Sequence, residues 1–183
     1  MLVLGIDPGL KGGLCILNEE GIVALETMPI TTRNKRKGNW LDVEKIYDFI
    51  SDYTDSSEDK EVIQHISIER QFILRSQGMS SGSKTMFQSG ILYGLCWPLC
   101  YSMEEVNAKD WQKIIFPKVD MDKLKKYSSY ADTKLKSIAY VEQTYGLDYL
   151  FTSSRQSVPK DGLADAICIA AAGLEAQLKT IKQ

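Results

Sequence analysis

Short apolar runs separated by turn residues dominate the first thirty residues of the chain. Residues 2–6 form one such run, which ends at Asp7-Pro8-Gly9, a turn signal because proline fixes its φ angle and glycine leaves the backbone free. Two further apolar runs follow at residues 14–17 and 22–28, each after a glycine-containing turn. This pattern predicts a three-stranded antiparallel meander.

Helical and strand patterns alternate after the meander. Apolar residues recur at helical spacing over residues 41–50, and residues 62–69 are rich in β-branched side chains, which indicates a central strand. Alternation along that strand places His65, Ser67 and Glu69 on one face. Strands paired by hairpins and then separated by helices predict an α/β fold, with a sheet that is partly antiparallel and partly parallel.

The second half of the chain is mostly helical in pattern. The glycine- and serine-rich residues 78–84 predict a flexible loop. The helix expected after it has one stripe made of Phe87, Gly90, Ile91, Gly94 and Leu95, whose glycines would let another element approach closely. The remaining segments are a strand within residues 98–106 and helices over residues 111–116, 133–145 and 161–179.

Length and composition predict one globular domain spanning residues 1–183. The chain has no apolar run of about 18 residues and no basic start before an apolar stretch, so we expect neither membrane insertion nor secretion, and a cytoplasmic location. The four cysteines lie in apolar segments, which is typical of buried free thiols in a reducing compartment.

The net charge of −2 argues against a chain that binds nucleic acid over its whole surface. The basic residues are nevertheless clustered. Residues 123–136 contain five lysines against a single acid, and a second run contains four basic residues, Arg33, Lys35, Arg36 and Lys37. Either run alone is typical of a solvated face, but two runs in one small domain predict a local surface for anions.

Four carboxylates stand where a charge is structurally awkward: Asp7 and Glu69 end apolar strands, and Asp161 and Asp165 begin the last helix, one turn apart. Each has an ordinary explanation. Asp7 can open a turn, Glu69 can pair with Arg70 or a lysine, Asp161 can be a helix N-cap, and Asp165 can favour the positive end of the helix. Together they could surround Mg²⁺, which prefers oxygen ligands. Two such ions about 4 Å apart can support cleavage of a phosphodiester.

Three segments that contain these carboxylates resemble the acidic motifs of RuvC-like Holliday junction resolvases, most closely the phage-type members, within the ribonuclease H-like superfamily. These segments are residues 5–9 (GIDPG), 68–71 (IERQ) and 160–166 (KDGLADA). The resemblance extends to residues 83–94, 106–113 and 132–138, and so covers most of the chain in order. There is one departure: bacterial members place their third acidic residue at the position of Gly162, whereas this chain has Asp161.

The resemblance implies a ribonuclease H-like fold with a five-stranded mixed sheet flanked by helices. It also implies a homodimer that nicks opposed strands of a four-way DNA junction, with further branched DNA as substrate. Asp7, Glu69, Asp161 and Asp165 become the ligands of two Mg²⁺ ions, for which Mn²⁺ can substitute. Lys134 matches a lysine close to the scissile phosphate, and Phe72 matches an aromatic that inserts toward bases at the junction centre.

Other residues near these motifs are candidates for contact with phosphates, namely Arg70, Arg75 and Lys84. Two other functions remain open from the residues, and a third is disfavoured by length. A ribonuclease H that cuts RNA–DNA hybrids would share the fold and the metal chemistry, and a junction-binding protein without catalysis would tolerate loss of the carboxylates. An actin-like kinase would need two such domains, for which 183 residues are too few.

Overall fold

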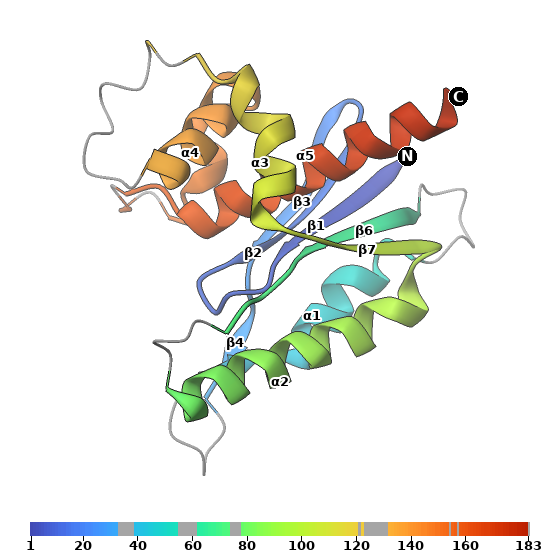
Figure 1. Cartoon of the computed structure of the whole chain (residues 1–183), viewed down its shortest axis with the longest axis vertical. Helices are drawn as coiled ribbons and strands as arrows, with labels where there is room; N and C mark the ends of the chain where they lie inside the picture. The colour runs from blue at the N-terminus through green and yellow to red at the C-terminus, as the bar shows by residue number, and fades with distance from the viewer. Residues whose placement is uncertain are drawn as a thin grey trace.

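A five-stranded mixed sheet with the order β3-β2-β1-β6-β7 forms the centre of the computed structural model (Figure 1). The strands β1 (Leu2–Asp7), β2 (Gly13–Asn18) and β3 (Gly21–Thr27) pair antiparallel, which confirms the predicted meander. β6 (Ile63–Glu69) and β7 (Ser102–Val106) continue the sheet in parallel with β1. The structure describes residues 1–32, 39–54, 62–73, 78–120, 122, 132–153, 155–156 and 158–182.

Helices cover both faces of this sheet (Figure 1). One face packs against α1 (Val43–Ser51) and α2 (Met79–Cys96), beside a small sheet of β4 (Ile30–Thr31) and β5 (Trp40–Leu41). The other face packs against α3 (Ala108–Ile115), α4 (Asp132–Thr144) and α5 (Asp161–Ile181). Short 3₁₀ turns complete the described chain at Trp97–Leu99, Phe116–Lys118 and Leu147–Leu150.

Alternation along the central strands assigns their side chains to these two cores. Leu4 and Ile6 of β1 belong to the core under α1 and α2, whereas Val3 belongs to the core under α5. Ile66 and Ile68 of β6 likewise face α1 and α2, so the predicted face of His65, Ser67 and Glu69 points toward α5.

Helix α5 lies directly on the backbone of the sheet. A Cβ atom built on Gly5 of β1 would lie 2.3 Å from the backbone nitrogen of Ala170, and one built on Gly173 would lie 2.3 Å from Oγ of Ser67. Only glycine allows the two main chains to come this close. The contact fixes α5 against β1 and β6, the two strands that end in candidate carboxylates.

Two predictions for the region of α2 are wrong. Residues 79–84 are helical and not a loop, because Gly82 packs against Ile73, and this contact outweighs the low helix propensity of serine and glycine. Nor does another described element closely approach the side of α2 that carries Gly90 and Gly94, since no described atom lies within 4 Å of a Cβ on either glycine. The buried positions of α2 are Gly82, Gln88, Ser89, Leu92 and Cys96.

The cysteines are free, as predicted, and three of them are buried while Cys100 is partly exposed. No helix in the described parts of the chain is long and apolar enough to cross a membrane.

Candidate functional site

Asp7 and Glu69 lie at the carboxyl ends of neighbouring parallel strands. The register pairs Gly5 with Ser67 and Ile6 with Ile68, so the two acidic residues follow at the same edge of the sheet. Both side chains are half-buried and point to the α5 side, because they alternate with Ile6 and Ile68 of the opposite core. Ligands of α/β proteins commonly bind at this edge.

Asp161 and Asp165 approach the same edge from the first turns of α5. Asp165 is half-buried and accepts a hydrogen bond from the buried hydroxyl of Ser137 on α4. Asp161 forms an ion pair with Lys134, also on α4. The structure therefore brings together the four predicted carboxylates and the predicted lysine, which come from β1, β6, α4 and α5.

Asp161 does not cap the helix, in contrast to the N-cap alternative. Lys160 occupies the N-cap position, no side chain caps the helix there, and Asp161 is the first helical residue. Its carboxylate is instead held by the ammonium group of Lys134.

Burial and mutual repulsion make these carboxyl groups weaker acids than usual. Desolvation raises the pKa of Asp7 to about 6, assisted by the negative charges of Glu69 and Asp161. Desolvation also raises the pKa of Asp165 to about 7, with further repulsion from Asp7 and Asp161. The pKa of Glu69 is raised by burial and by the charge of Asp165. The Asp161 carboxylate, through its hydrogen bond, raises the pKa of Lys134. The site carries more negative charge than its own residues neutralise.

The donor set of this site fits a hard divalent cation. Mg²⁺ and Mn²⁺ prefer carboxylate oxygens, and a cation would offset the desolvation and the mutual repulsion that raise the pKa values of Asp7 and Asp165. Within the described residues, however, no three His, Cys, Asp or Glu side chains already form a closed ligand cluster. Asp161, in particular, is turned to Lys134. A cation would thus compete with Lys134 for one of the carboxylates.

Two residues that support the carboxylates were not singled out from the sequence. The indole N–H of Trp111 on α3 donates a hydrogen bond of 2.7 Å to Oε2 of Glu69. Ser137 supports Asp165 in the same way. Neither bond has a local sequence signal, because α3 and α4 meet the sheet only after the chain has folded.

Phe72 and Arg70 lie together just beyond Glu69. The phenyl ring of Phe72 is 56% exposed, and the Arg70 guanidinium lies 5.1 Å from its centroid and 3.6 Å from a carboxylate oxygen of Glu105. Lys84 lies on α2, with its ammonium group 4.8 Å from the centroid of the Trp40 ring. The other predicted phosphate contacts fall outside the described residues: Arg33, Lys35, Arg36, Lys37 and Arg75.

The single histidine of the chain has a structural position. His65 is 3% exposed, and its ring nitrogens lie 2.7 Å from the Ser102 hydroxyl and 3.1 Å from the Ser67 hydroxyl. Glu104 is 3.2 Å from the same ring. This buried network closes the imidazole off from a substrate, which disfavours histidine-based nucleophilic chemistry.

No protein-family model and no curated protein matches this chain. Solved structures do match it over nearly its whole length. The RuvC of Thermus thermophilus, in complex with a Holliday junction substrate, is 16% identical with a TM-score of 0.56, and covers 98% of this chain and 97% of its own. A second structure of Thermus thermophilus RuvC gives 20% identity, a TM-score of 0.54 and coverage of 98% of both chains.

The chain has the RuvC fold. This result confirms the predicted ribonuclease H-like architecture of a five-stranded mixed sheet flanked by helices. The yeast mitochondrial Holliday junction resolvase Ydc2 also matches, at 20% identity and a TM-score of 0.44, over 98% of this chain and 82% of its own. Within this RuvC fold, the carboxylates lie at the carboxyl edge of β1 and β6, where α5 begins.

Proposed function

We propose that this chain is a metal-dependent endonuclease that resolves four-way DNA junctions by paired nicks, through a single nuclease domain spanning residues 1–183. One observation carries the proposal: Asp7, Glu69, Asp161 and Asp165 converge from β1, β6 and α5 at one edge of a RuvC fold. Carboxylates gathered in this way, without a histidine, suit phosphodiester cleavage assisted by metal ions. The resemblance of the motifs to phage-type resolvases supports the same assignment.

The four carboxylates would hold two Mg²⁺ ions, with Mn²⁺ able to replace them. When bound, such ions activate a water molecule and stabilise the leaving oxygen. The protein supplies orientation: Trp111 holds Glu69, and Ser137 holds Asp165. Lys134 carries the positive charge nearest to Asp161, where it can stabilise negative charge that develops on the phosphate.

Phe72 and Arg70 form the proposed contact with the junction centre. An exposed aromatic ring can stack on an unpaired base, and the guanidinium beside it can hold a phosphate. Both follow Glu69 directly along the chain, so a base at Phe72 would belong to DNA that also reaches the carboxylates. The same pair would suit other branched DNA, and the Thermus thermophilus RuvC was solved with a Holliday junction.

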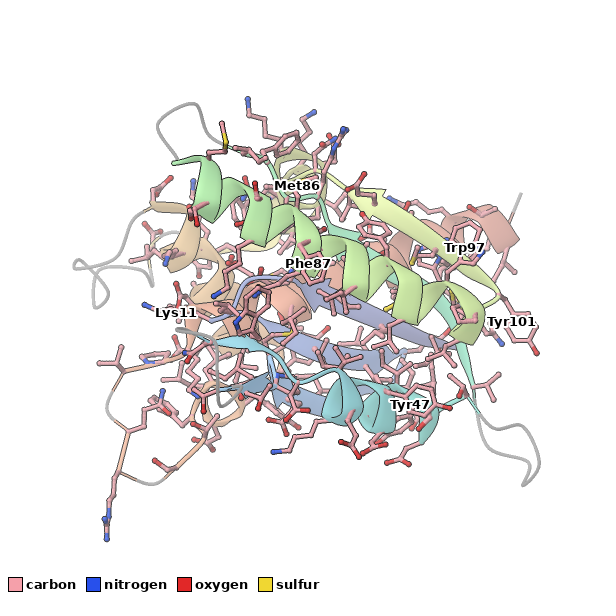
Figure 2. All side chains as sticks on the ribbon, turned by 90° about the horizontal axis from the view of Figure 1, so that it is seen from below. Lys11, Tyr47, Met86, Phe87, Trp97 and Tyr101 are labelled. Carbon is pink, nitrogen blue, oxygen red and sulfur yellow. The ribbon has the colours of Figure 1, made fainter. Side chains whose placement is uncertain are left out.

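We also propose a homodimer, because paired nicks on one junction require two sites. The surface that supports it is the open face of α2, defined by Met86, Phe87, Gly90, Gly94 and Trp97, with Tyr101 beyond its end and Tyr47 of α1 beside it (Figure 2). Phe87 is 57% and Trp97 70% exposed. The five residues that define this face carry no charge, and Lys84, the one charged residue of α2, lies at its edge on the Trp40 ring that Phe87 also contacts. An exposed patch of large apolar side chains on one helix face commonly marks a contact with another protein chain.

A second copy of the chain is the occupant that this surface fits. Across a two-fold axis the same patch meets itself, so a patch without charge avoids like-charge contacts. DNA would instead require cations. Gly94→Lys tests this, because its Cβ has open space and the new charge would face its copy. We expect wild type to be dimeric and Gly94→Lys monomeric in sedimentation. The control Val23→Lys, exposed on β3, should stay dimeric, and a monomeric wild type would contradict the proposal.

The decisive experiment is incubation with an end-labelled four-way junction, with and without Mg²⁺, followed by mapping of the nicks. We expect symmetric nicks on opposed strands with Mg²⁺ and none with EDTA. A matched linear duplex is the negative control, and an RNA–DNA hybrid tests the alternative of a ribonuclease H. Cleavage of the hybrid but not of the junction would overturn the assignment, and binding without nicking would indicate a non-catalytic junction protein.

A further inference from the structure

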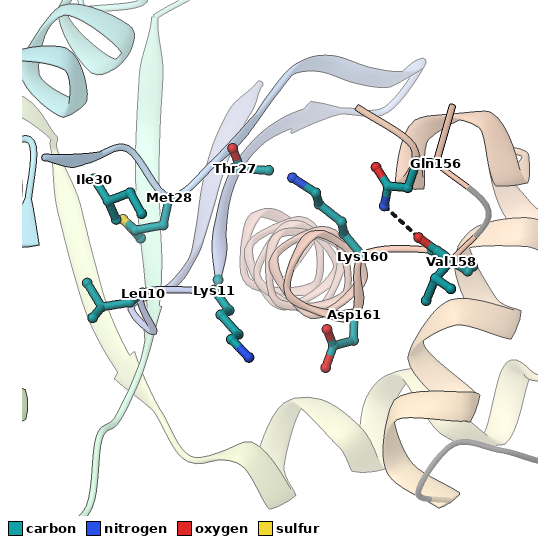
Figure 3. Close-up of a pocket in the computed structure, with 11 residues that line it drawn as sticks. Leu10, Lys11, Thr27, Met28, Ile30, Gln156, Val158, Lys160 and Asp161 are labelled. Atoms are coloured by element: carbon teal, nitrogen blue, oxygen red, sulfur yellow. Dashed lines mark hydrogen bonds between the residues drawn. The ribbon is translucent and has the colours of Figure 1, made fainter. Parts of the chain in front are cut away.

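A pocket of about 420 Å³ lies beside the carboxylate site and shares Asp161 with it (Figure 3). Its walls come from the turn between β1 and β2, from the segment that joins β3 to β4, and from the residues before α5. The volume is in the range of about 300–1,000 Å³ that is common for small-ligand sites. The functional assignments above leave this pocket without a role.

One side of the pocket is apolar. Leu10, Met28 and Ile30 lie together there, as Figure 3 shows. Met28 is 3% exposed and anchored in the core, whereas Ile30 is 43% exposed and forms the rim. Such a surface suits the face of a planar, weakly polar group.

The other side of the pocket is cationic. Lys11 and Lys160 both line it, from different segments of the chain, and neither forms an ion pair with any other described residue. Figure 3 shows Lys160 reaching across toward Thr27, while Lys11 and Asp161 extend to the same side of the α5 axis. The Asp161 carboxylate is already paired with Lys134. The pocket therefore carries net positive charge, although the chain as a whole is acidic.

Main-chain contacts and the side chain of Gln156 hold the walls of the pocket in place. A Cβ on Gly162 would lie 2.0 Å from the carbonyl oxygen of Lys11, so the start of α5 and the β1–β2 turn touch directly. The side chain of Gln156 fixes the segment before α5, accepting from the backbone N–H of Thr152 at 3.1 Å and donating to the carbonyl of Val158 at 2.5 Å. The pocket is thus formed before a ligand arrives, which lowers the cost of binding.

We propose that this pocket binds the nucleotide next to the scissile phosphate of the cut strand, with the base against Leu10, Met28 and Ile30 and the backbone phosphate held by Lys11 and Lys160. The inference rests on the proposed nuclease function, since a strand whose phosphate reaches the carboxylates must pass Asp161. It adds a subsite that reads the base beside the nick. The sequence preference of cleavage then depends on the residues of this pocket.

The phosphate part of the proposal is tested by the salt dependence of junction binding, measured in EDTA so that no cleavage occurs. Each phosphate that a lysine neutralises contributes about 0.7–0.9 to the slope of log affinity against log salt concentration. We expect Lys11→Ala/Lys160→Ala to lower that slope by about 0.7–0.9 per protomer, because the two lysines hold one phosphate. The control Lys179→Ala, at the far end of α5 and paired with Glu175, should keep the wild-type slope.

The base part is tested with junctions that carry one abasic residue at successive positions around the nick. Wild type should lose nicking rate several-fold at one position adjacent to the nick. Leu10→Ala/Ile30→Ala should cut the intact junction more slowly and lose nothing further at that position, because the contact is already absent. Val23→Ala, an exposed apolar residue of β3, should reproduce the wild-type profile.

The outcomes separate this inference from the proposed function. A wild-type slope for Lys11→Ala/Lys160→Ala, or an unchanged abasic profile for Leu10→Ala/Ile30→Ala, would overturn the subsite while nicking by wild type still supports the nuclease. A wild-type protein that binds junctions but never nicks them would overturn the nuclease. In that case the slope of the lysine variant, measured without metal, still decides whether the pocket holds the strand.

Discussion

Asp7 and Asp165 show how position changes the chemistry of an ordinary side chain. Each lies where the sheet edge, α5 and the neighbouring acids remove water and add negative charge, so their pKa values rise to about 6 and about 7. A sequence motif can identify these residues as candidates, but it does not reveal the raised pKa values, because these arise from groups that are distant in the chain. Single substitutions that remove a charge therefore test the proposed site directly.

Asp7→Asn should abolish nicking and leave the fold and junction binding largely intact. The amide oxygen can still accept the 3.2 Å hydrogen bond from the backbone N–H of Gly9, but the charge that attracts a cation is lost. Nicking of a labelled junction, circular dichroism and junction affinity in EDTA measure the three effects. Asp148→Asn, at an exposed position, is the control that should nick normally. A folded Asp7→Asn protein with wild-type rates would exclude Asp7 from the metal site.

Asp165→Asn should stabilise the metal-free protein at high pH. Because the folded-state pKa of Asp165 is raised from 3.8 to about 7, the folded protein holds a proton that the unfolded chain releases, and stability is lost as pH rises through this interval. Asparagine does not ionise, so the free energy of unfolding of the variant should exceed that of wild type by on the order of 2 kcal/mol at about pH 8. Near pH 4 the two should be almost equal. Denaturant titrations at several pH values measure the difference, and equal destabilisation at every pH would contradict this origin.

Lys134→Met should move metal affinity and nicking in opposite directions. Without the ammonium group Asp161 is free for a cation, so Mn²⁺ should bind about two- to fivefold more tightly, the range expected for loss of a competing exposed ion pair. Nicking should become slower, because a positive charge near the phosphate is lost. Lys136→Met is the matched control on the same helix, since Lys136 pairs with Asp132 instead. Equal metal affinity in the two variants would rule out competition by Lys134.

Among the secondary-structure elements, the strands of the large sheet and the helices α1, α3, α4 and α5 were predicted from apolar patterns, whereas the packed side of α2 was not. The runs at β1, β2, β3 and β6 were predicted as strands, and the common face of His65, Ser67 and Glu69 on β6 was predicted correctly, because alternate residues of a strand point to opposite sides. Helix α2 was misread, since its packed positions include Gly82, Gln88 and Ser89 while Phe87 points outward. The supporting bonds of Trp111 and Ser137 lie beyond any local pattern, because they depend on how α3 and α4 dock.

Gly5→Ala tests the docking of α5 on β1. Its Cβ would lie 2.3 Å from the backbone of Ala170, so α5 must shift, and we expect a loss of about 3 kcal/mol in the free energy of unfolding. Gly78→Ala is the control, because no described atom lies near its Cβ and its φ is −61°; its cost should stay below about 1 kcal/mol. Chemical denaturation measures both, and similar values for the two variants would contradict the contact.

At the scale of the whole molecule, the proposed dimer and the proposed DNA complex rest on opposite kinds of surface. The open face of α2 lacks charge, whereas the pocket lysines and Arg70, which would contact the DNA, are cationic. Raising the salt concentration from about 0.1 M to about 1 M should therefore release the junction while the dimer persists. Light scattering and fluorescence anisotropy on the same samples measure the two equilibria. A dimer that dissociates together with the DNA complex would show that charge contributes to both.

The backbone contact between Gly5 and Ala170 has a consequence for how the site can fluctuate. Asp7 is two residues beyond Gly5, and Asp165 is five residues before Ala170, so the main chain itself sets the spacing of the two carboxylates. Neither can drift without opening the centre of the sheet. Amide hydrogen exchange in β1 and in the middle of α5 should then proceed only through global unfolding. Metal should then slow amide exchange in these segments only by as much as it raises the free energy of global unfolding, because the site is already rigid without metal.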